Sequence, residues 1–113
     1  MAADNAFHCD VEKLEQKDAS GNRVTKIHCH GRLVSSTADT IKGVVKPLIQ
    51  GGGRIVIDLQ DVSHLDSSGL GTLVGLKASA IHQGFCILEL ENMTPRVMEL
   101  LRITNLLQLF SSK

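Results

Sequence analysis

Residues 55–71 read IVIDLQDVSHLDSSGLG and join a strand pattern to a helix start. The run Ile55–Leu59 is rich in β-branched residues and follows three glycines, which predicts a buried strand. After a predicted loop over Gln60–Leu65, apolar residues return with the spacing of one helix face, at Leu70, Leu73, Val74, Ala78 and Ile81. The pattern therefore predicts a strand that leads through a short loop into an amphipathic helix.

Asp66, Ser67 and Ser68 stand where that helix begins. Side chains of these types accept hydrogen bonds from the free N–H groups of a first helical turn. The same turn carries the positive end of the helix dipole, so a serine hydroxyl is expected beside a carboxylate in a positive field. Helix capping alone explains all three residue types, whereas two serines and an aspartate exceed what one cap needs.

The remaining segments alternate between strand and helix patterns. Cys9–Leu14 and Val24–Cys29 flank a turn cluster at Asp18–Asn22, which predicts a hairpin. Ser36, followed three residues later by Asp39, fits a capping box in its aspartate form and predicts a helix start. The further predicted elements are a helix, a strand, a helix capped by Thr94 and a short last strand, at residues 37–49, Phe85–Leu90, 95–104 and Leu107–Phe110.

This order predicts one α/β domain over residues 1–113, with a mixed sheet of about five strands and helices packed against it. Ile55–Leu59 is expected to be a central strand with parallel neighbours. Residues 1–5 are small and polar and are expected to form a loose leader. A chain of 113 residues has the size of a single domain, so one core is expected.

The composition argues against several classes of function. Lys plus Arg and Asp plus Glu are balanced at 12 each, so no overall field attracts nucleic acid or an anionic membrane. Tryptophan and tyrosine are absent and phenylalanine occurs three times, which leaves little for base stacking. The sequence also has no long apolar run and no secretion signal pattern.

The three cysteines lack the paired spacing of a disulfide framework, which favours a reducing compartment. A cytoplasmic protein is therefore expected, with Cys9, Cys29 and Cys86 all reduced. Each lies in a predicted strand, and Cys86 is expected to be buried.

The strand Ile55–Leu59, followed by LDSSGLG at Leu65–Gly71, resembles the signature of the STAS domain of bacterial anti-sigma-factor antagonists. The resemblance extends to the hairpin, the turn at Gly31–Leu33 and the closing helix. In these antagonists the serine after the aspartate is phosphorylated by an anti-sigma factor that is also a kinase, and the phosphate controls partner binding. By position, that serine is Ser67.

The resemblance implies a binding module without enzymatic activity or a cofactor. Its partners would be an anti-sigma factor with serine kinase activity, whose capture frees a sigma factor, and a phosphatase. The same fold also serves as a non-switching scaffold or as a subunit of signalling or transport assemblies, in which the serines would be caps only. The residues expected to contact the partner are Asp66, Ser68, Gly69, Gly71, Gly75 and Arg32.

One position departs from the family pattern. Antagonists often carry Gly-Glu-Leu-Asp at the first turn, whereas this chain has Gly31-Arg32-Leu33-Val34. Two carboxylates near the expected partner surface are missing, and a cation replaces one of them. The fold is unaffected by this change, but the partner's identity is left open, as is the oligomeric state.

Two other chemistries fail on spacing. The glycines at Gly69, Gly71 and Gly75 place the third glycine one residue too late for the dinucleotide pattern Gly-x-Gly-x-x-Gly. Ser67 lacks the Gly-x-Ser-x-Gly elbow of a hydrolase nucleophile, because Leu65 stands at the first glycine position.

The histidines near the N-terminus raise the question of a metal site. On a strand, His28 and His30 share one face while Cys29 points to the other, and the hairpin brings His8 and Cys9 near. No Cys-x-x-Cys pair or helical histidine pair supports a metal site. Solvated strand histidines are therefore expected, without a metal.

Overall fold

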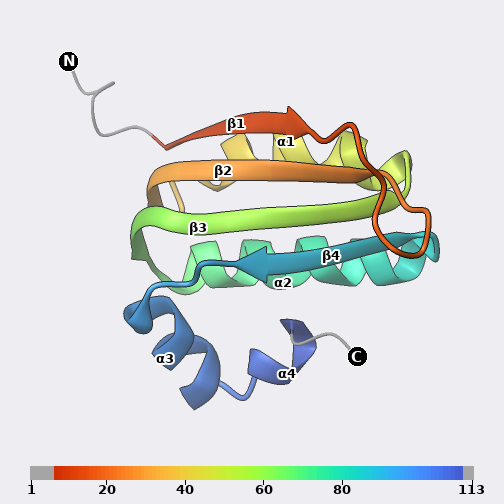
Figure 1. Cartoon of the computed structure of the whole chain (residues 1–113). Coiled ribbons are helices and arrows are strands. Elements are labelled where there is room, and N and C mark those ends of the chain that lie inside the picture. Colours follow the sequence, from red (N-terminus) through yellow and green to blue (C-terminus); the bar gives the residue numbers. More distant parts are fainter. Residues whose placement is uncertain (1–6, 111–113) are drawn as a thin grey trace.

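The computed structural model describes residues 7–110 and shows the expected alternation of strands and helices (Figure 1). The predicted loose leader, residues 1–5, lies outside the described residues. The elements in chain order are β1 (His8–Lys13), β2 (Val24–Leu33), α1 (Ala38–Gln50), β3 (Gly53–Leu65), α2 (Ser67–Gln83), β4 (Cys86–Glu91), α3 (Pro95–Ile103) and α4 (Leu107–Phe110).

Within residues 7–110, the sheet has four strands in the order β1-β2-β3-β4. Strands β1 and β2 pair antiparallel, which confirms the hairpin, and β3 lies parallel to both β2 and β4. Ile55–Leu59 is therefore part of an interior strand with two parallel neighbours, as the sequence predicted.

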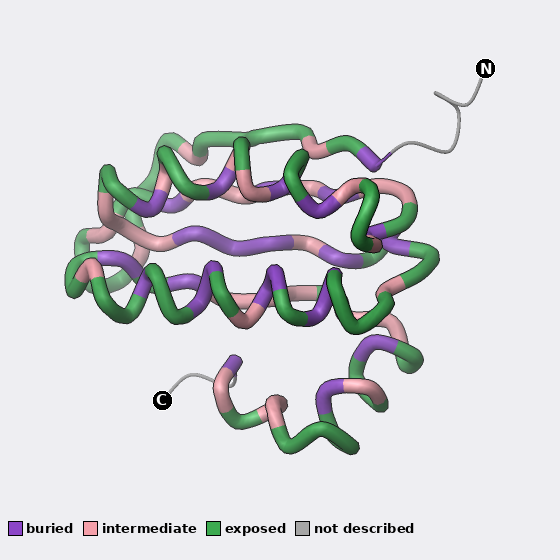
Figure 2. Tube along the Cα trace, turned by 180° about the vertical axis from the view of Figure 1, so that it is seen from behind, coloured by how far each residue is buried: buried purple, intermediate pink, exposed green. Residues whose placement is uncertain are grey.

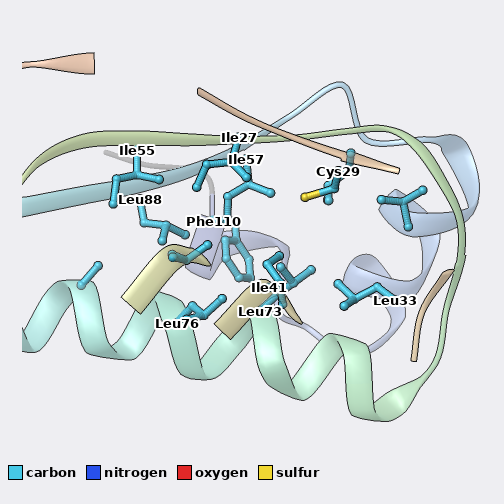
Figure 3. Close-up of a cluster of buried hydrophobic side chains, with 14 of the residues drawn as sticks. Ile27, Cys29, Leu33, Ile41, Ile55, Ile57, Leu73, Leu76, Leu88 and Phe110 are labelled. Carbon is cyan, nitrogen blue, oxygen red and sulfur yellow. The ribbon is translucent and has the colours of Figure 1, made fainter. Parts of the chain in front are cut away.

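Helices α1 and α2 cover one face of the sheet, and the core lies between these helices and the sheet (Figure 2). The other face is turned to the viewer in Figure 1, where no described helix crosses it, and we call it the open face. Ile27 of β2, Ile57 of β3 and Leu73 of α2 are fully buried in the core cluster (Figure 3). One face of the sheet is thus apolar and covered, while the open face is available to solvent and polar side chains.

Helix α2 buries a somewhat different side from the one predicted. Leu70 and Leu73 are buried as expected, but Ala78 and Ile81 are exposed. The buried side instead continues through Leu76, Lys77 and Ala80. Leucine buries more apolar area than alanine, so the helix turns its leucines toward the sheet.

The predicted loop over Gln60–Leu65 is wrong, because β3 continues to Leu65. The polar residues of this segment suggested a loop, yet the segment pairs with β2 as far as Leu33 opposite Leu65. Two register shifts in β2, one of them at Gly31 with a φ of 109°, accommodate the longer pairing. The strand therefore leads directly into α2, without the intervening loop.

The predicted last strand at Leu107–Phe110 is also wrong, since these residues form the helical turn α4. A four-residue segment with three apolar residues does not distinguish a strand from a buried helical turn by periodicity. Phe110 belongs to the same core cluster as Ile57 and Leu73 (Figure 3). The sheet therefore has four strands where about five were expected, and the α/β class with parallel pairs is confirmed.

Helix α1 begins directly after Thr37, and the predicted capping box of Ser36 and Asp39 is wrong. Thr37 is the N-cap residue, but its hydroxyl makes no cap hydrogen bond. It accepts from the backbone N–H of Val34 at 3.0 Å and donates to the carbonyl oxygen of Arg32. The hydroxyl thus fastens the connection between β2 and α1.

The three cysteines are free thiols. Cys86 is buried, as predicted. Cys9 and Cys29 face each other across β1 and β2, with 3.8 Å between their sulfur atoms. Among the described helices, none has both the length and the apolar character needed to cross a membrane.

Candidate functional site

Asp66 directly follows β3 and caps α2. Its backbone is extended, with φ −102° and ψ −174°, and its carboxylate accepts a hydrogen bond from the backbone N–H of Gly69 at 2.8 Å. A carboxylate in this place also interacts favourably with the helix dipole. Of the three residues that the sequence offered as caps, Asp66 is the one that caps, and Ser68 lies inside the first turn.

Ser67 is the first residue of α2 and its side chain is exposed. Within residues 7–110 its hydroxyl makes no hydrogen bond. The hydroxyl therefore lies at the positive end of a 17-residue helix, next to the capping carboxylate, and is open to an incoming enzyme.

Gly69 is buried where the ends of two strands meet the helix. A β-carbon at this position would overlap the backbone carbonyl of Leu33 and come within 2.9 Å of the Leu65 side chain. The backbone N–H of Asp66 also lies 3.4 Å from the Leu33 carbonyl oxygen. Gly69 is therefore required for packing, and it holds the Asp66–Ser67 junction against the end of β2.

Gly71 and Gly75 lie on the exposed side of α2, and a β-carbon at either would meet no atom of another described segment within 4 Å. Among residues 7–110, no neighbouring element therefore packs closely against these two glycines. Instead they line a groove of about 590 Å³ between α1 and α2. The groove is lined by Ser35, Ala38, Asp39, Lys42, Lys46, Ser68, Gly71, Thr72, Gly75, Leu76 and Ser79.

Two lysines of this groove, Lys42 and Lys46, were not among the residues singled out from the sequence. They follow Asp39 at i+3 and i+7, so one side of α1 carries all three charges. The ammonium of Lys42 lies 3.9 Å from the Asp39 carboxylate, which is fully exposed. The helical spacing was visible in the sequence, but only the structure shows that this side of α1 faces Gly71 and Gly75.

Arg32 is exposed near the end of β2, where its register partner is His64. Its side chain makes no hydrogen bond or ion pair within the described part of the chain. Because Leu33 pairs with Leu65, Arg32 lies at the same end of the sheet as the capping residue Asp66. The structure thus brings the predicted site residues to one end of the molecule, with Gly71 and Gly75 one and two turns along α2.

Of the residues considered for a metal site, the structure brings two histidines together on the open face. His8 and His30 stack with ring centroids 4.7 Å apart. His28 lies on the same face between Glu12, at 3.0 Å, and Asp58, at 3.2 Å. These two carboxylates raise the pKa of His28. Cys29 points into the core, as the strand alternation predicted.

Comparison with known proteins agrees with the fold. Residues 13–113 match the model of the STAS domain family. Over 81 residues, or 72% of this chain and 73% of the relative, the sequence is 35% identical to the anti-sigma-B factor antagonist of Bacillus subtilis (strain 168).

The solved structures that share the fold include two of SpoIIAA. One is the anti-sigma factor antagonist SpoIIAA in its unphosphorylated form, with a TM-score of 0.67 and 20% identity over 87% of this chain and 81% of that one. The other is the Bacillus cell fate determinant SpoIIAA in its phosphorylated form, with a TM-score of 0.63 and 19% identity over 89% and 85%. This chain therefore belongs to the STAS domain family and is similar to its anti-sigma factor antagonists.

Proposed function

We propose that this chain is a phosphorylation-controlled protein-binding module, with Ser67 as the phosphate acceptor. The unphosphorylated form binds an anti-sigma factor that is also a serine kinase, and so frees a sigma factor in the cytoplasm. A phosphatase restores the binding form. The chain acts by binding and has no catalytic role. The observation that carries the proposal is the exposed hydroxyl of Ser67, which has no partner within the described residues.

The partner contacts the groove between α1 and α2. Ser68 belongs to its lining and directly follows Ser67, so a phosphate on Ser67 lies at the N-terminal end of the groove. The described residues that line this groove give it a net positive charge, since they include Lys42 and Lys46 but only one carboxylate, Asp39. The groove therefore favours an acidic partner surface, because opposite charges across an interface steer and orient association.

A phosphate changes the partner contact more than it changes the fold. It adds about −1.5 to −2 charges. At the start of α2 that charge gains about 0.3–1 kcal/mol from the helix dipole. A partner carboxylate about 4 Å away is repelled by roughly 4 kcal/mol per charge pair at an effective dielectric near 20. This corresponds to about a thousandfold in affinity, so binding is lost while the domain stays folded.

The relatives support the same assignment. The Bacillus subtilis relative is named for antagonism of an anti-sigma factor, and a protein of the same fold has been solved in a phosphorylated form. Asp66 and Ser67 supply what such a switch needs in this chain, a capped helix start and an accessible hydroxyl.

Phosphate transfer tests the acceptor. The wild-type chain, Ser67→Ala and the matched control Ser68→Ala are incubated with ATP and candidate anti-sigma factor kinases, and intact masses are recorded. We expect one phosphate on the wild type and on Ser68→Ala, and none on Ser67→Ala. If Ser67→Ala is phosphorylated as fully as the wild type, Ser67 is not the phosphate acceptor. If the wild type accepts no phosphate from any kinase, the result favours a non-switching scaffold.

A further inference from the structure

The open face of the sheet carries a cluster of metal-ligating side chains that the proposed function does not use. His8 and Asp10 are two positions apart on β1, so their side chains point to the same side of the sheet. His30 of β2 lies directly opposite His8 in the antiparallel register. Asp61 of β3 is the register partner of His30. Three neighbouring strands thus deliver two imidazoles and two carboxylates to one place.

The distances suit a single ion. The Nε2 atom of His30 lies 3.2 Å from the Oδ2 atom of Asp10, and the Nε2 atom of His8 lies 3.9 Å from the same oxygen. The three ligand atoms all lie within 4.8 Å of one another. A tetrahedral ion with bonds of about 2.0–2.1 Å separates its ligand atoms by about 3.3 Å. His8 and Asp10 are exposed, so their side chains have room to rotate toward His30 and shorten these distances.

Asp61 orients one of the ligands. Its Oδ2 atom lies 2.9 Å from the Nδ1 atom of His30. An ionised carboxylate only accepts hydrogen bonds, so Nδ1 donates to Asp61, and Nε2 is the nitrogen that would lose its proton to bind a metal ion beside Asp10. The carboxylate–histidine arrangement of metal sites works in this way, because the outer carboxylate fixes the tautomer and strengthens the ligand.

The chemistry of the donors selects the ion. Two imidazole nitrogens and one carboxylate oxygen suit Zn²⁺, with water in the remaining position, whereas Mg²⁺ and Ca²⁺ prefer sites built from oxygen. We propose that His8, Asp10 and His30 bind a zinc ion on the open face, with Asp61 as the positioning residue. The ion joins the edge strand β1 to β2. This inference is independent of the proposed function, and it revises the expectation that the strand histidines are only solvated.

The neighbouring histidine provides a matched control. His28 lies on the same face, but it is the only histidine between its two carboxylates, Glu12 and Asp58. His28→Ala therefore removes one imidazole from the open face without removing any of the three ligands. A loss of binding in His30→Ala but not in His28→Ala separates a defined site from general attraction to an acidic, histidine-bearing surface.

Zinc titration by calorimetry, on untagged and chelator-treated protein, tests the site. We expect one Zn²⁺ per wild-type chain, retained affinity in His28→Ala, and no saturable binding in His30→Ala. Asp61→Ala should weaken binding about 10–100-fold, and Asp61→Asn, which keeps an accepting oxygen, should recover part of that loss. Circular dichroism confirms that each variant is folded.

Two further readouts identify the ligands. Mg²⁺ in place of Zn²⁺ should give no binding, and Co²⁺ should bind without thiolate charge-transfer bands, because the proposed ligands include no cysteine. The proposal is overturned if the wild type takes up no zinc, if His30→Ala binds it like the wild type, or if His28→Ala loses it equally. Equal binding of Mg²⁺, or thiolate bands with Co²⁺, would also overturn it.

Discussion

The carbonyl oxygen of Leu33 occupies the space that a β-carbon on Gly69 would need. The end of β2 and the first turn of α2 are therefore in direct contact, and Asp66 and Ser67 are held in place beside it. Gly69→Ala should destabilise the domain by about 1–3 kcal/mol, as overpacking of a filled site does. Denaturant unfolding of the variant measures this cost.

Gly71→Ala is the matched control for Gly69→Ala, because it lies two residues further along the same helix and its added β-carbon meets no atom of another segment within residues 7–110 at less than 4 Å. Alanine in a helix interior is favoured over glycine by about 0.5–1 kcal/mol, so this variant should be more stable than the wild type. If both variants shift the free energy of unfolding alike, the close contact with Leu33 has no role in stability.

Asp66→Ala should cost about 0.5–2 kcal/mol, because it removes the side-chain bond to the Gly69 N–H. Ser68→Ala should change the free energy of unfolding by less than about 0.5 kcal/mol, since Ser68 is exposed and does not cap. Thermal or urea unfolding of Asp66→Ala and Ser68→Ala shows which of the two side chains caps the helix. A larger loss in Ser68→Ala than in Asp66→Ala would contradict this description of the helix start.

Protonation of Asp18 in acid should lower the free energy of unfolding. The Asn22 backbone N–H and the Arg54 guanidinium, at 2.8 and 2.9 Å from its carboxylate, help to lower the pKa of Asp18 from 3.8 to about 2. A carboxyl whose pKa is lower in the folded state stabilises the fold fully above its unfolded pKa, and this contribution is lost as pH falls from about 4 to about 2.

Asp18→Asn removes the titrating group at the same position and serves as the control. Urea unfolding at about pH 5 and about pH 3 should show a smaller acid-induced loss of stability in Asp18→Asn than in the wild type. An identical pH dependence in the two proteins would show that folding does not lower the pKa of Asp18.

The core of the fold was predictable because it depends on local pattern. The β-branched run Ile55–Leu59 and the helix that starts after Asp66 are each encoded by adjacent residues, and both appear in the structure. The cap of α3 was predictable for the same reason, since the Thr94 hydroxyl accepts from the Val97 N–H at 3.3 Å. Such features depend on short-range hydrogen bonds and on burial of one face.

The features that were missed depend on contacts between distant segments. Leu107–Phe110 becomes a helical turn because Phe110 enters the core, a tertiary effect that overrides a short apolar pattern. The groove that contains Lys42 depends on how α1 lies beside α2, and the pairing of His8 with His30 depends on the hairpin register. Composition and spacing do not fix either arrangement.

The switch at Ser67 is tested by the affinity of the chain for candidate anti-sigma factor kinases, measured for the wild type, Ser67→Ala, Ser67→Asn and Ser67→Asp. Ser67→Asn is the matched control, because asparagine is close to aspartate in size but carries no charge. Melting temperatures of the four proteins show whether each variant remains folded.

Ser67→Ala and Ser67→Asn should bind about as tightly as the wild type. Ser67→Asp should stay folded, since a carboxylate is favourable at a helix N-terminus, and should bind at least about tenfold more weakly, a loss of about 1.4 kcal/mol. Equal affinity of Ser67→Asp and the wild type for every partner would contradict the switch.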